Sequence, residues 1–425
     1  DASKGFMKDG PKNRLRDQDL HKIVDVFNNQ IIQTRYSRMV NFKEIEGNDY
    51  NLNIPRYIDS SAAEDLHDLS AHLSGGIPNV DIKALDEYWK VFPSLRKTLF
   101  IADREGYSKA LVKAAEVKNT ILEHKEFKAF AELSITLFHN WKDMANLPAL
   151  NQNDLPKEVI HNISESLLTA FTDAPLLDRY DMFQIIMDYW NETMQDDVYF
   201  ITQDGWAAAN SIRELLVKKG EKQKEIPDLI IKKSKYKAEL IPPALIVKRY
   251  FKDEQKQIDE LQATADASTQ ELEAYIEEHA VEGDLLEEAL TDSGKISRAS
   301  VAARQKKATD KDEITALKQV KMLLEAEAEN KKLVKIGQEA LDKQVFRQYS
   351  KLNEFENKTL VVDDKWLATL QANIIAEIER VTQQLANRVK TLEERYEAPL
   401  PALIKEVEQL SANVDEHLKK MGLMW

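Results

Sequence analysis

The chain has 425 residues and a mass of 48.8 kDa, with 43% hydrophobic and 31% charged residues, which is a globular composition sufficient for roughly two or three cores. It has no cysteine, which excludes disulfides, thiolate zinc sites and a cysteine nucleophile, and its 12 Gly and 12 Pro indicate few turns and a mainly α fold. Its net charge of −14 argues against strong binding of duplex DNA by this chain alone, because Lys and Arg supply most non-specific affinity for phosphates.

Nothing in the sequence directs the chain to a membrane. No apolar run approaches the roughly 20 residues needed to span a bilayer, and the first residues do not form a secretory signal pattern. The absence of cysteine fits a cytoplasmic protein. Because the chain opens at Asp1-Ala2-Ser3 within a predicted loop, we expect it to be a portion of a longer protein.

Residues 1–58 show a mixed α/β pattern. Asp17 and Asp19 mark the first turn of a predicted helix. Its apolar positions have i, i+3, i+4, i+7 spacing and are Leu20, Ile23, Val24 and Phe27. Apolar and polar residues alternate over 50–54 and predict a strand that ends at Pro55.

Residues 59–290 have a helical period and are predicted to form a helical domain. The predicted helices cover 82–89, stretches within 108–147, 156–171, 175–195 and, after Pro242-Pro243, about 244–279. The run Val198-Tyr199-Phe200-Ile201, followed by Asp204-Gly205, predicts a strand and a turn. Residues 291–312 are rich in Ser and Lys and predict a mobile loop.

Residues 313–425 are predicted to be a long-helix assembly region. After a helix over 313–345, apolar residues recur every three or four positions from Leu367 to Tyr396, and again from Leu403 to Met421 beyond Pro399 and Pro401. We interpret this as a pair of helices whose apolar edges need a partner, either elsewhere in this chain or in another subunit. The candidate partner-binding positions are Leu385, Val389, Leu392, Tyr396, Leu403, Val407, Leu410, Val414 and Leu418.

A search for catalytic chemistry finds no convergent set. There is no Gly-rich strand-to-helix turn for S-adenosylmethionine, no Asn/Asp-Pro-Pro-aromatic tetrapeptide for a flipped base, and no nucleotide-binding loop. The eight His are read as surface or boundary residues, and Asp196-Asp197 as an acidic turn rather than a metal site. The aromatic group is read as core rather than as a base-stacking platform and comprises Tyr180, Tyr189, Trp190, Tyr199 and Trp206.

Several blocks along the chain resemble the modification subunit of type I restriction-modification systems. In order, the blocks are Asp1-Ala2-Ser3-Lys4-Gly5-Phe6, Asn48-Asp49-Tyr50-Asn51-Leu52, Ala84-Leu85-Asp86-Glu87-Tyr88-Trp89, Leu177-Asp178-Arg179-Tyr180, Gln203-Asp204-Gly205-Trp206 and Glu393-Glu394-Arg395-Tyr396-Glu397-Ala398-Pro399-Leu400-Pro401. Their order and spacing, rather than any one block, carry the resemblance.

The resemblance implies an adenine-N6 DNA methyltransferase in which residues 1–58 close the catalytic α/β domain. It implies S-adenosylmethionine as the cofactor of the complete enzyme, a specificity subunit and a restriction subunit as partners, and DNA bound through the assembled complex. The family's cofactor and Asn-Pro-Pro-Phe motifs lie upstream of the Asp-Ala-Ser segment, so we expect this chain to bind no cofactor and to be inactive alone. Candidate DNA contacts are Lys4, Lys8, Lys12, Arg14 and Arg16, with Arg304, Lys306 and Lys307 as a second group, and the alternative interpretation is that all of these are solvated loop charges.

Two other interpretations stay open at this point. A helical scaffold or coiled-coil adaptor unrelated to DNA modification explains the periodicity but not the α/β pattern of residues 1–58. An intact enzyme with an unrecognised site is the weakest interpretation, because no catalytic residues converge in the sequence.

Overall fold

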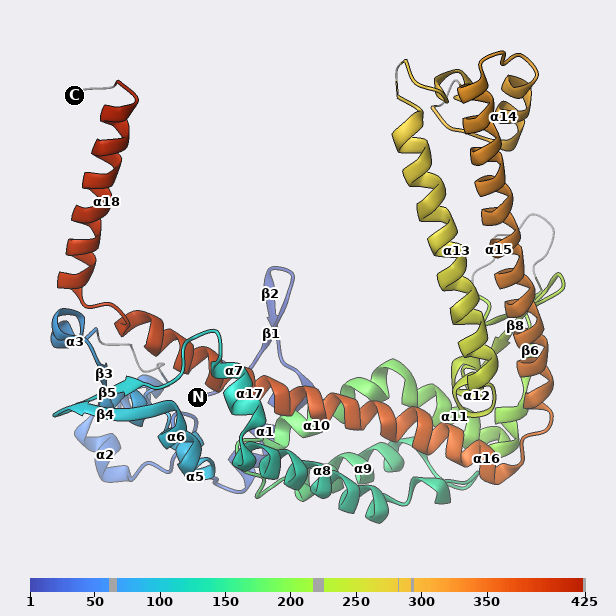
Figure 1. Ribbon diagram of the computed structural model, residues 1–425. Helices are drawn as coiled ribbons and strands as arrows, with labels where there is room; N and C mark the ends of the chain where they lie inside the picture. Colours follow the sequence, from blue (N-terminus) through green and yellow to red (C-terminus); the bar gives the residue numbers. More distant parts are fainter. Residues whose placement is uncertain (61–66, 217–224, 282, 292–293, 423–425) are drawn as a thin grey trace. The chain divides into compact units, whose positions relative to one another are not determined.

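The computed structural model describes residues 1–60, 67–216, 225–281, 283–291 and 294–422, and this part of the chain is mainly α-helical, as predicted (Figure 1). It divides into two compact units. Unit 1 comprises Asp1–Val198 and Trp366–Trp425, and unit 2 comprises Tyr199–Lys365. Unit 2 is therefore one continuous segment, whereas unit 1 is built from both ends of the chain.

Unit 1 is a helical assembly with two small antiparallel sheets. Its helices are α1 (Asp17–Asn28), α2 (Phe42–Gly47), α3 (Leu69–Ser74), α4 (Asn79–Lys83), α5 (Asp86–Val91), α6 (Pro93–Leu99), α7 (Val117–Glu123), α8 (Lys125–Ala145), α9 (Pro156–Ala170), α10 (Arg179–Tyr189), α17 (Ala368–Tyr396) and α18 (Leu400–Lys420). Its strands are β1 (Met7–Asp9) and β2 (Lys12–Arg14), which pair with each other, and β3 (Ile77–Pro78), β4 (Phe100–Arg104) and β5 (Tyr107–Ala110), in the order β3-β5-β4.

The core of unit 1 lies between α17 and the helices α7, α8 and α10, with α9 packed on α8 and α10. Each of these helices buries one stripe at three- and four-residue spacing, as an amphipathic helix must. On α8 the stripe includes Phe130, Phe138 and Trp141, and the Trp141 indole nitrogen donates a hydrogen bond of 2.9 Å to the Ser166 hydroxyl on α9. The core of unit 1 is therefore complete only when α17, from late in the chain, packs against the helices of residues 117–189.

Unit 2 contains a three-stranded antiparallel sheet and a long helical hairpin. Its strands are β6 (Ile212–Glu214), β7 (Leu229–Ile231) and β8 (Ser234–Ala238), in the order β6-β8-β7. Its helices are α12 (Pro243–Tyr250), α13 (Lys252–His279), α14 (Arg298–Gln305), α15 (Lys311–Tyr349) and α16 (Glu354–Lys358). Helices α13 and α15 lie side by side (Figure 1), and Ile258, Ala265 and Leu272 form a buried seam on α13 at seven-residue spacing.

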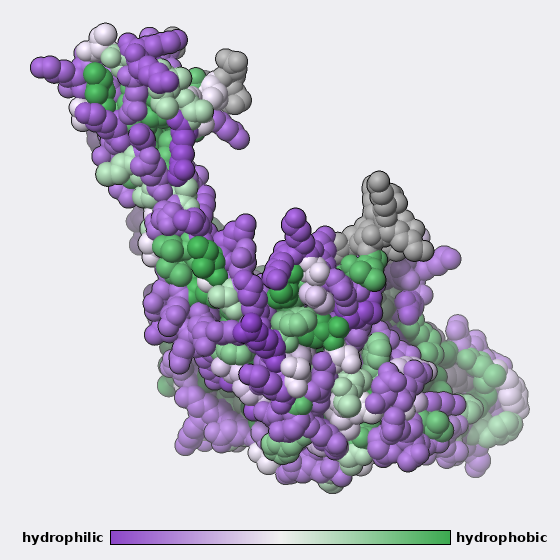
Figure 2. All heavy atoms as spheres, turned by 90° about the vertical axis from the view of Figure 1, so that its right-hand side faces the viewer, coloured by the Kyte–Doolittle hydropathy of each residue, from purple (hydrophilic) through white to green (hydrophobic). Residues whose placement is uncertain are grey.

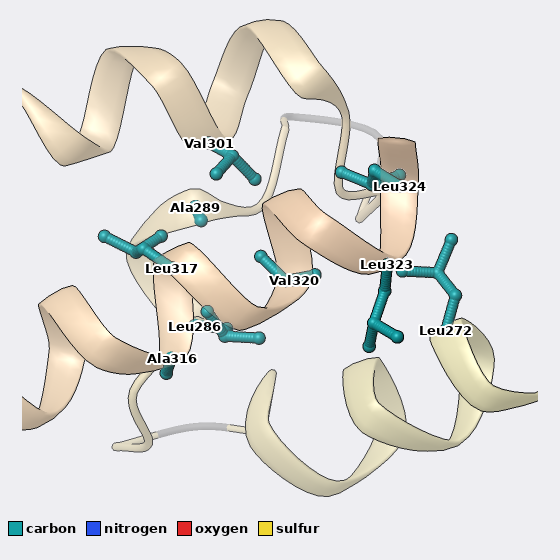
Figure 3. Close-up of a cluster of buried hydrophobic side chains, with 9 residues drawn as sticks. All are labelled: Leu272, Leu286, Ala289, Val301, Ala316, Leu317, Val320, Leu323 and Leu324. Atoms are coloured by element: carbon teal, nitrogen blue, oxygen red, sulfur yellow. The ribbon is translucent and has the colours of Figure 1, made fainter. Parts of the chain in front are cut away.

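A cluster of aliphatic side chains closes the hairpin where α13 ends and α15 begins (Figure 3). Val301 of α14 is buried in it together with Leu286 and with Leu317 and Val320 of α15. The outer surface of the hairpin is mainly hydrophilic in the view of Figure 2. The cluster is therefore a core that unit 2 forms at this end of the hairpin.

A buried hydrogen bond joins the two points where the chain leaves and re-enters unit 1. The Trp366 indole nitrogen donates to the Asp197 carboxylate at 2.7 Å, and both residues are almost fully buried. Asp197 belongs to α11 (Gln195–Asp204), which follows the π-helical turn Trp190–Met194, and Trp366 lies in the π-helical segment Thr359–Leu367. A wider turn inserts an extra residue into the helix and rotates the following side chains.

Several local predictions were wrong. Asp196-Asp197 was predicted to be an acidic turn, but both residues lie in the first turn of the helix α11. The run Val198–Ile201 is helical, within α11, because Val198 and Ile201 are buried together on one face at three-residue spacing. Residues 50–54 form no strand: residues 51–53 are irregular and Ile54 begins a short 3-10 helix, and the Asn51 side chain accepts a hydrogen bond from the backbone N–H of Asn53. Part of the expected loop 291–312 is the helix α14, which the buried Val301 anchors.

Candidate functional site

Helix α18 carries an apolar stripe that is exposed to solvent. None of its residues is buried, and exposed fractions are 62% for Val407, 56% for Leu410 and 56% for Val414. Leu403 is exposed as well, while Leu418 is partly buried. Five of the predicted partner-binding positions therefore lie on a helix that the described part of this chain does not cover.

The other four predicted partner-binding positions lie on α17 and are not a free surface, which corrects the expectation. They are buried inside unit 1, with exposed fractions of 4% or less, and are Leu385, Val389, Leu392 and Tyr396. The reason is that α7, α8 and α10 pack against α17 within the same unit. The α17 stripe is a core stripe, although its spacing is the same as that of α18.

The break between these helices explains why their stripes have different surroundings. Residues Pro399 and Pro401 flank the start of α18, where a missing backbone N–H does no harm because the first turn has no helical acceptor for it. Pro399 also lies close to Gly75, where an added Cβ would meet the Pro399 Cγ at 3.2 Å. Helix α18 thus starts against the end of α3 and then continues without a packed neighbour among the described residues.

The candidate DNA contacts of residues 4–16 fall mostly on the ribbon β1–β2, which we name the basic hairpin. All six strand residues are exposed, and the ribbon stands off from the helices of unit 1 (Figure 1). The register pairs Met7 with Arg14 and Asp9 with Lys12, so Lys12 and Arg14 share one face. Among the described residues, neither of these two cations has an ion-pair partner.

Three of the other candidate cations, Lys4, Arg16 and Arg304, have partners. Arg16 forms an ion pair of 2.9 Å with Asp19, and Lys4 donates a hydrogen bond to the backbone carbonyl of Ser60. On α14, Arg304 is paired with Glu313 and Glu288, while Lys306 and Lys307, which follow the helix, are exposed. The basic hairpin is therefore the better-placed of the two groups for contact with an anionic ligand.

Helix α1 is attached to the rest of unit 1 by its polar face. The Gln18 side chain donates a hydrogen bond of 2.8 Å to Asp181, and the Lys22 ammonium lies 2.9 Å from Asp178. His21 contacts Glu165 of α9 at 2.8 Å. Sequence reasoning missed this interface, although polar residues at positions 18, 21, 22 and 25 repeat with a helical period opposite the apolar stripe.

Asp25 is the centre of the strongest group of contacts on this polar face. It accepts hydrogen bonds from the Tyr180 hydroxyl and from the Arg179 guanidinium. Burial opposes its charge, but hydrogen bonds from Tyr180 and Asn29 and the charge of Arg179 outweigh burial and lower the pKa of Asp25. Burial and the bond to Asp25 raise the pKa of Tyr180 to about 12.

Residues 1–60 bury no apolar side chain among the residues that the structure describes. The two side chains that this segment does bury are polar, Gln18 and Asp19. Its exposed large apolar side chains are Met7, Leu15, Leu20, Val24, Phe27, Ile32, Met39, Phe42, Tyr50, Leu52 and Ile54. The segment therefore has no apolar core of its own.

The described part of the chain brings no catalytic or metal-binding set together. No group of three or more His, Asp and Glu side chains there is arranged to hold a metal ion. In the aromatic group, Tyr180, Tyr189, Trp190 and Trp206 are buried, as predicted for core residues, whereas Tyr199 is exposed. No helix in the described ranges combines the length and apolarity required to cross a bilayer.

Comparison with known protein families relates the first part of the chain to DNA modification. Residues 1–66 match the model of the family described as N-6 DNA Methylase. No curated protein and no solved structure matches the chain. The match falls on the segment that contains the basic hairpin and α1, and it supports a relation to adenine-N6 DNA methyltransferases.

Proposed function

We propose that this chain is the carboxy-terminal part of the modification subunit of a type I restriction-modification DNA methyltransferase, acting in the cytoplasm. In the complete enzyme, S-adenosylmethionine would donate the methyl group to the N6 of adenine. This part would join the catalytic domain to a specificity subunit, and in the nuclease complex to a restriction subunit as well. DNA would be bound by the assembled complex.

The observation that carries the proposal is the coexistence of two features in one chain. Residues 1–66 match the N-6 DNA Methylase family, and α18 exposes an amphipathic stripe beyond a helical core. An exposed apolar stripe of this kind is typical of a surface that packs on another protein. The family match favours DNA modification over an unrelated helical adaptor, which would not account for residues 1–66.

We propose that the specificity subunit binds to the exposed apolar stripe of α18. The variant Leu403→Ser, Val407→Ser, Leu410→Ser should lose at least about a hundredfold in affinity for the specificity subunit, since apolar anchors dominate such interfaces. The control is Lys405→Ser, Glu416→Ser, which changes the opposite face and leaves the net charge unchanged. Co-purification from cells that express both subunits, followed by titration calorimetry, measures the difference.

Loss of binding can be distinguished from loss of folding. Helix content by circular dichroism should be the same in both variants, because all five positions are exposed or partly exposed in this chain. If the triple variant binds the specificity subunit as tightly as the control, α18 is not the assembly surface. If the gene encodes no α/β domain with a Gly-rich turn and an Asn-Pro-Pro-Phe stretch upstream of Asp1, the methyltransferase assignment is wrong.

A further inference from the structure

A polar seam joins helix α1 to α9 and α10, and its members on α1 are Gln18, His21, Lys22 and Asp25. At one end of the seam, the backbone N–H of Gln18 donates a hydrogen bond of 2.9 Å to the Gln184 side chain of α10. At the other end, Asp25 accepts hydrogen bonds from Tyr180 and Arg179, and its side chain is only 16% exposed. The seam therefore extends over about two turns of α1.

Lys22 lies in the middle of this seam. Its ammonium is 2.9 Å from the Asp178 carboxylate, and it lies 5.1 Å from the ring centres of both Tyr36 and Tyr180. A cation in this position is attracted by the carboxylate and by the faces of the two rings. Because Tyr36 follows α1 in the chain and Tyr180 belongs to α10, Lys22 holds the loop after α1 against the same surface.

These polar contacts stand in place of the apolar burial that stabilises most helices. None of the apolar side chains in residues 1–60 is buried. A helix of 12 residues such as α1 is marginal by itself, and each polar contact adds little net stability because its groups would otherwise bond to water. By contrast, α17 buries an apolar stripe from Leu370 to Tyr396 in the core of unit 1. The two parts of unit 1 are therefore held by different forces.

We propose that α1 is a latch: it is helical while the polar seam is closed, and residues 17–28 unfold locally while the core of unit 1 stays folded. Local opening of this kind is drawn from the parts of a protein that bury the least apolar surface. The latch also positions the basic hairpin, since β2 ends at Arg14 and α1 begins at Asp17. The proposal concerns unit 1 of this chain and does not depend on the proposed function.

Hydrogen exchange of this chain, followed by mass spectrometry of peptides from α1 and α17, tests the latch. Asp25→Ala removes the acceptor of Tyr180 and Arg179, so exchange in α1 should become at least about tenfold faster, because hydrogen bonds to a charged group are the stronger ones. Exchange in α17 should not change. The control is Leu20→Ala, on the exposed face of the same helix. Ala is the best helix former, so helix propensity alone would slow exchange in both variants.

A second variant acts from outside α1. Tyr180→Phe keeps the buried ring on α10 and removes only the hydroxyl that donates to Asp25, so it should speed exchange in α1 by at least about threefold. Equal acceleration of α1 and α17 by Asp25→Ala would overturn the proposal, because the seam would then unfold together with the core. Unchanged exchange in α1 for both seam variants would overturn it too, as would an equal acceleration by Leu20→Ala.

Discussion

Two leucines in stripes with the same spacing should differ greatly in how much stability the protein loses when each is truncated to Ala. Leu385 on α17 is 1% exposed, and Leu410 on α18 is 56% exposed. Leu385→Ala should lower the free energy of unfolding by about 2–5 kcal/mol, since the change removes buried methyl groups and leaves a cavity. Leu410→Ala should change it by less than about 0.5 kcal/mol, because the side chain is already in water and Ala is a good helix former.

Urea unfolding followed by indole fluorescence is a suitable assay. Four of the six tryptophans, Trp89, Trp141, Trp190 and Trp366, are buried in unit 1 and report on the core that contains α17. Because the chain has two units, the fluorescence transition is analysed separately from the circular dichroism of the helices, to which both units contribute.

The same variants separate stability from assembly. Leu410→Ala should weaken binding to the specificity subunit while leaving the midpoint of unfolding unchanged, and Leu385→Ala should lower that midpoint. Equal destabilisation of the isolated chain by both variants would refute the reasoning, because α18 would then be part of the internal core. No effect from Leu385→Ala would contradict the burial on which the assignment of α17 depends.

Four further outcomes are expected. Replacing Lys8, Lys12 and Arg14 of the basic hairpin with Gln should weaken the binding of duplex DNA by the assembled enzyme. The slope of log Kd against log salt, measured by anisotropy titration, should fall by about 0.9 for each phosphate that is no longer neutralised. An unchanged slope would exclude the hairpin as a DNA contact. Asp197→Leu should cost about 1–3 kcal/mol by leaving the Trp366 indole N–H buried without its acceptor, and Trp366→Phe in the same chain should recover part of that loss in a double-mutant cycle. Because the pKa of Tyr180 is raised to about 12, its contribution to stability should be complete below pH 10 and be lost as the pH rises from 10 to 12, and Tyr180→Phe should reduce the loss of stability over this range in alkaline unfolding curves. This chain alone should show no saturable binding of S-adenosylmethionine in calorimetry, since it has no Gly-rich strand-to-helix turn.

Periodicity predicted the long helices well. The predicted helix over 156–171 is α9 (Pro156–Ala170), and the predicted helix over 313–345 lies within α15 (Lys311–Tyr349). These segments have caps and long apolar stripes, so local and tertiary preferences agree. Short segments were less predictable: Val198–Ile201 has strand-forming residues, but packing of Val198 and Ile201 on one side makes a helix.

The interaction surfaces could be predicted only in part, because the spacing of an apolar stripe on a helix does not specify which neighbour packs on it. The stripes of α17 and α18 have the same three- and four-residue spacing, yet one is core and the other is exposed. On helix α1 the predicted apolar face is exposed, and the polar face makes the contacts with the rest of unit 1. Only the fold determines which surface receives a neighbour.

The return of the chain to unit 1 after residue 365 has a consequence during synthesis. Unit 2 is contiguous and can fold once Lys365 has left the ribosome, whereas the core of unit 1 must wait for α17. At roughly 5–20 residues per second, the helices of residues 117–189 remain without their partner for about 10–40 s. During that interval their apolar stripes are available to chaperones, and a release of the chain before Tyr396 would leave a folded unit 2 joined to a unit 1 that cannot close.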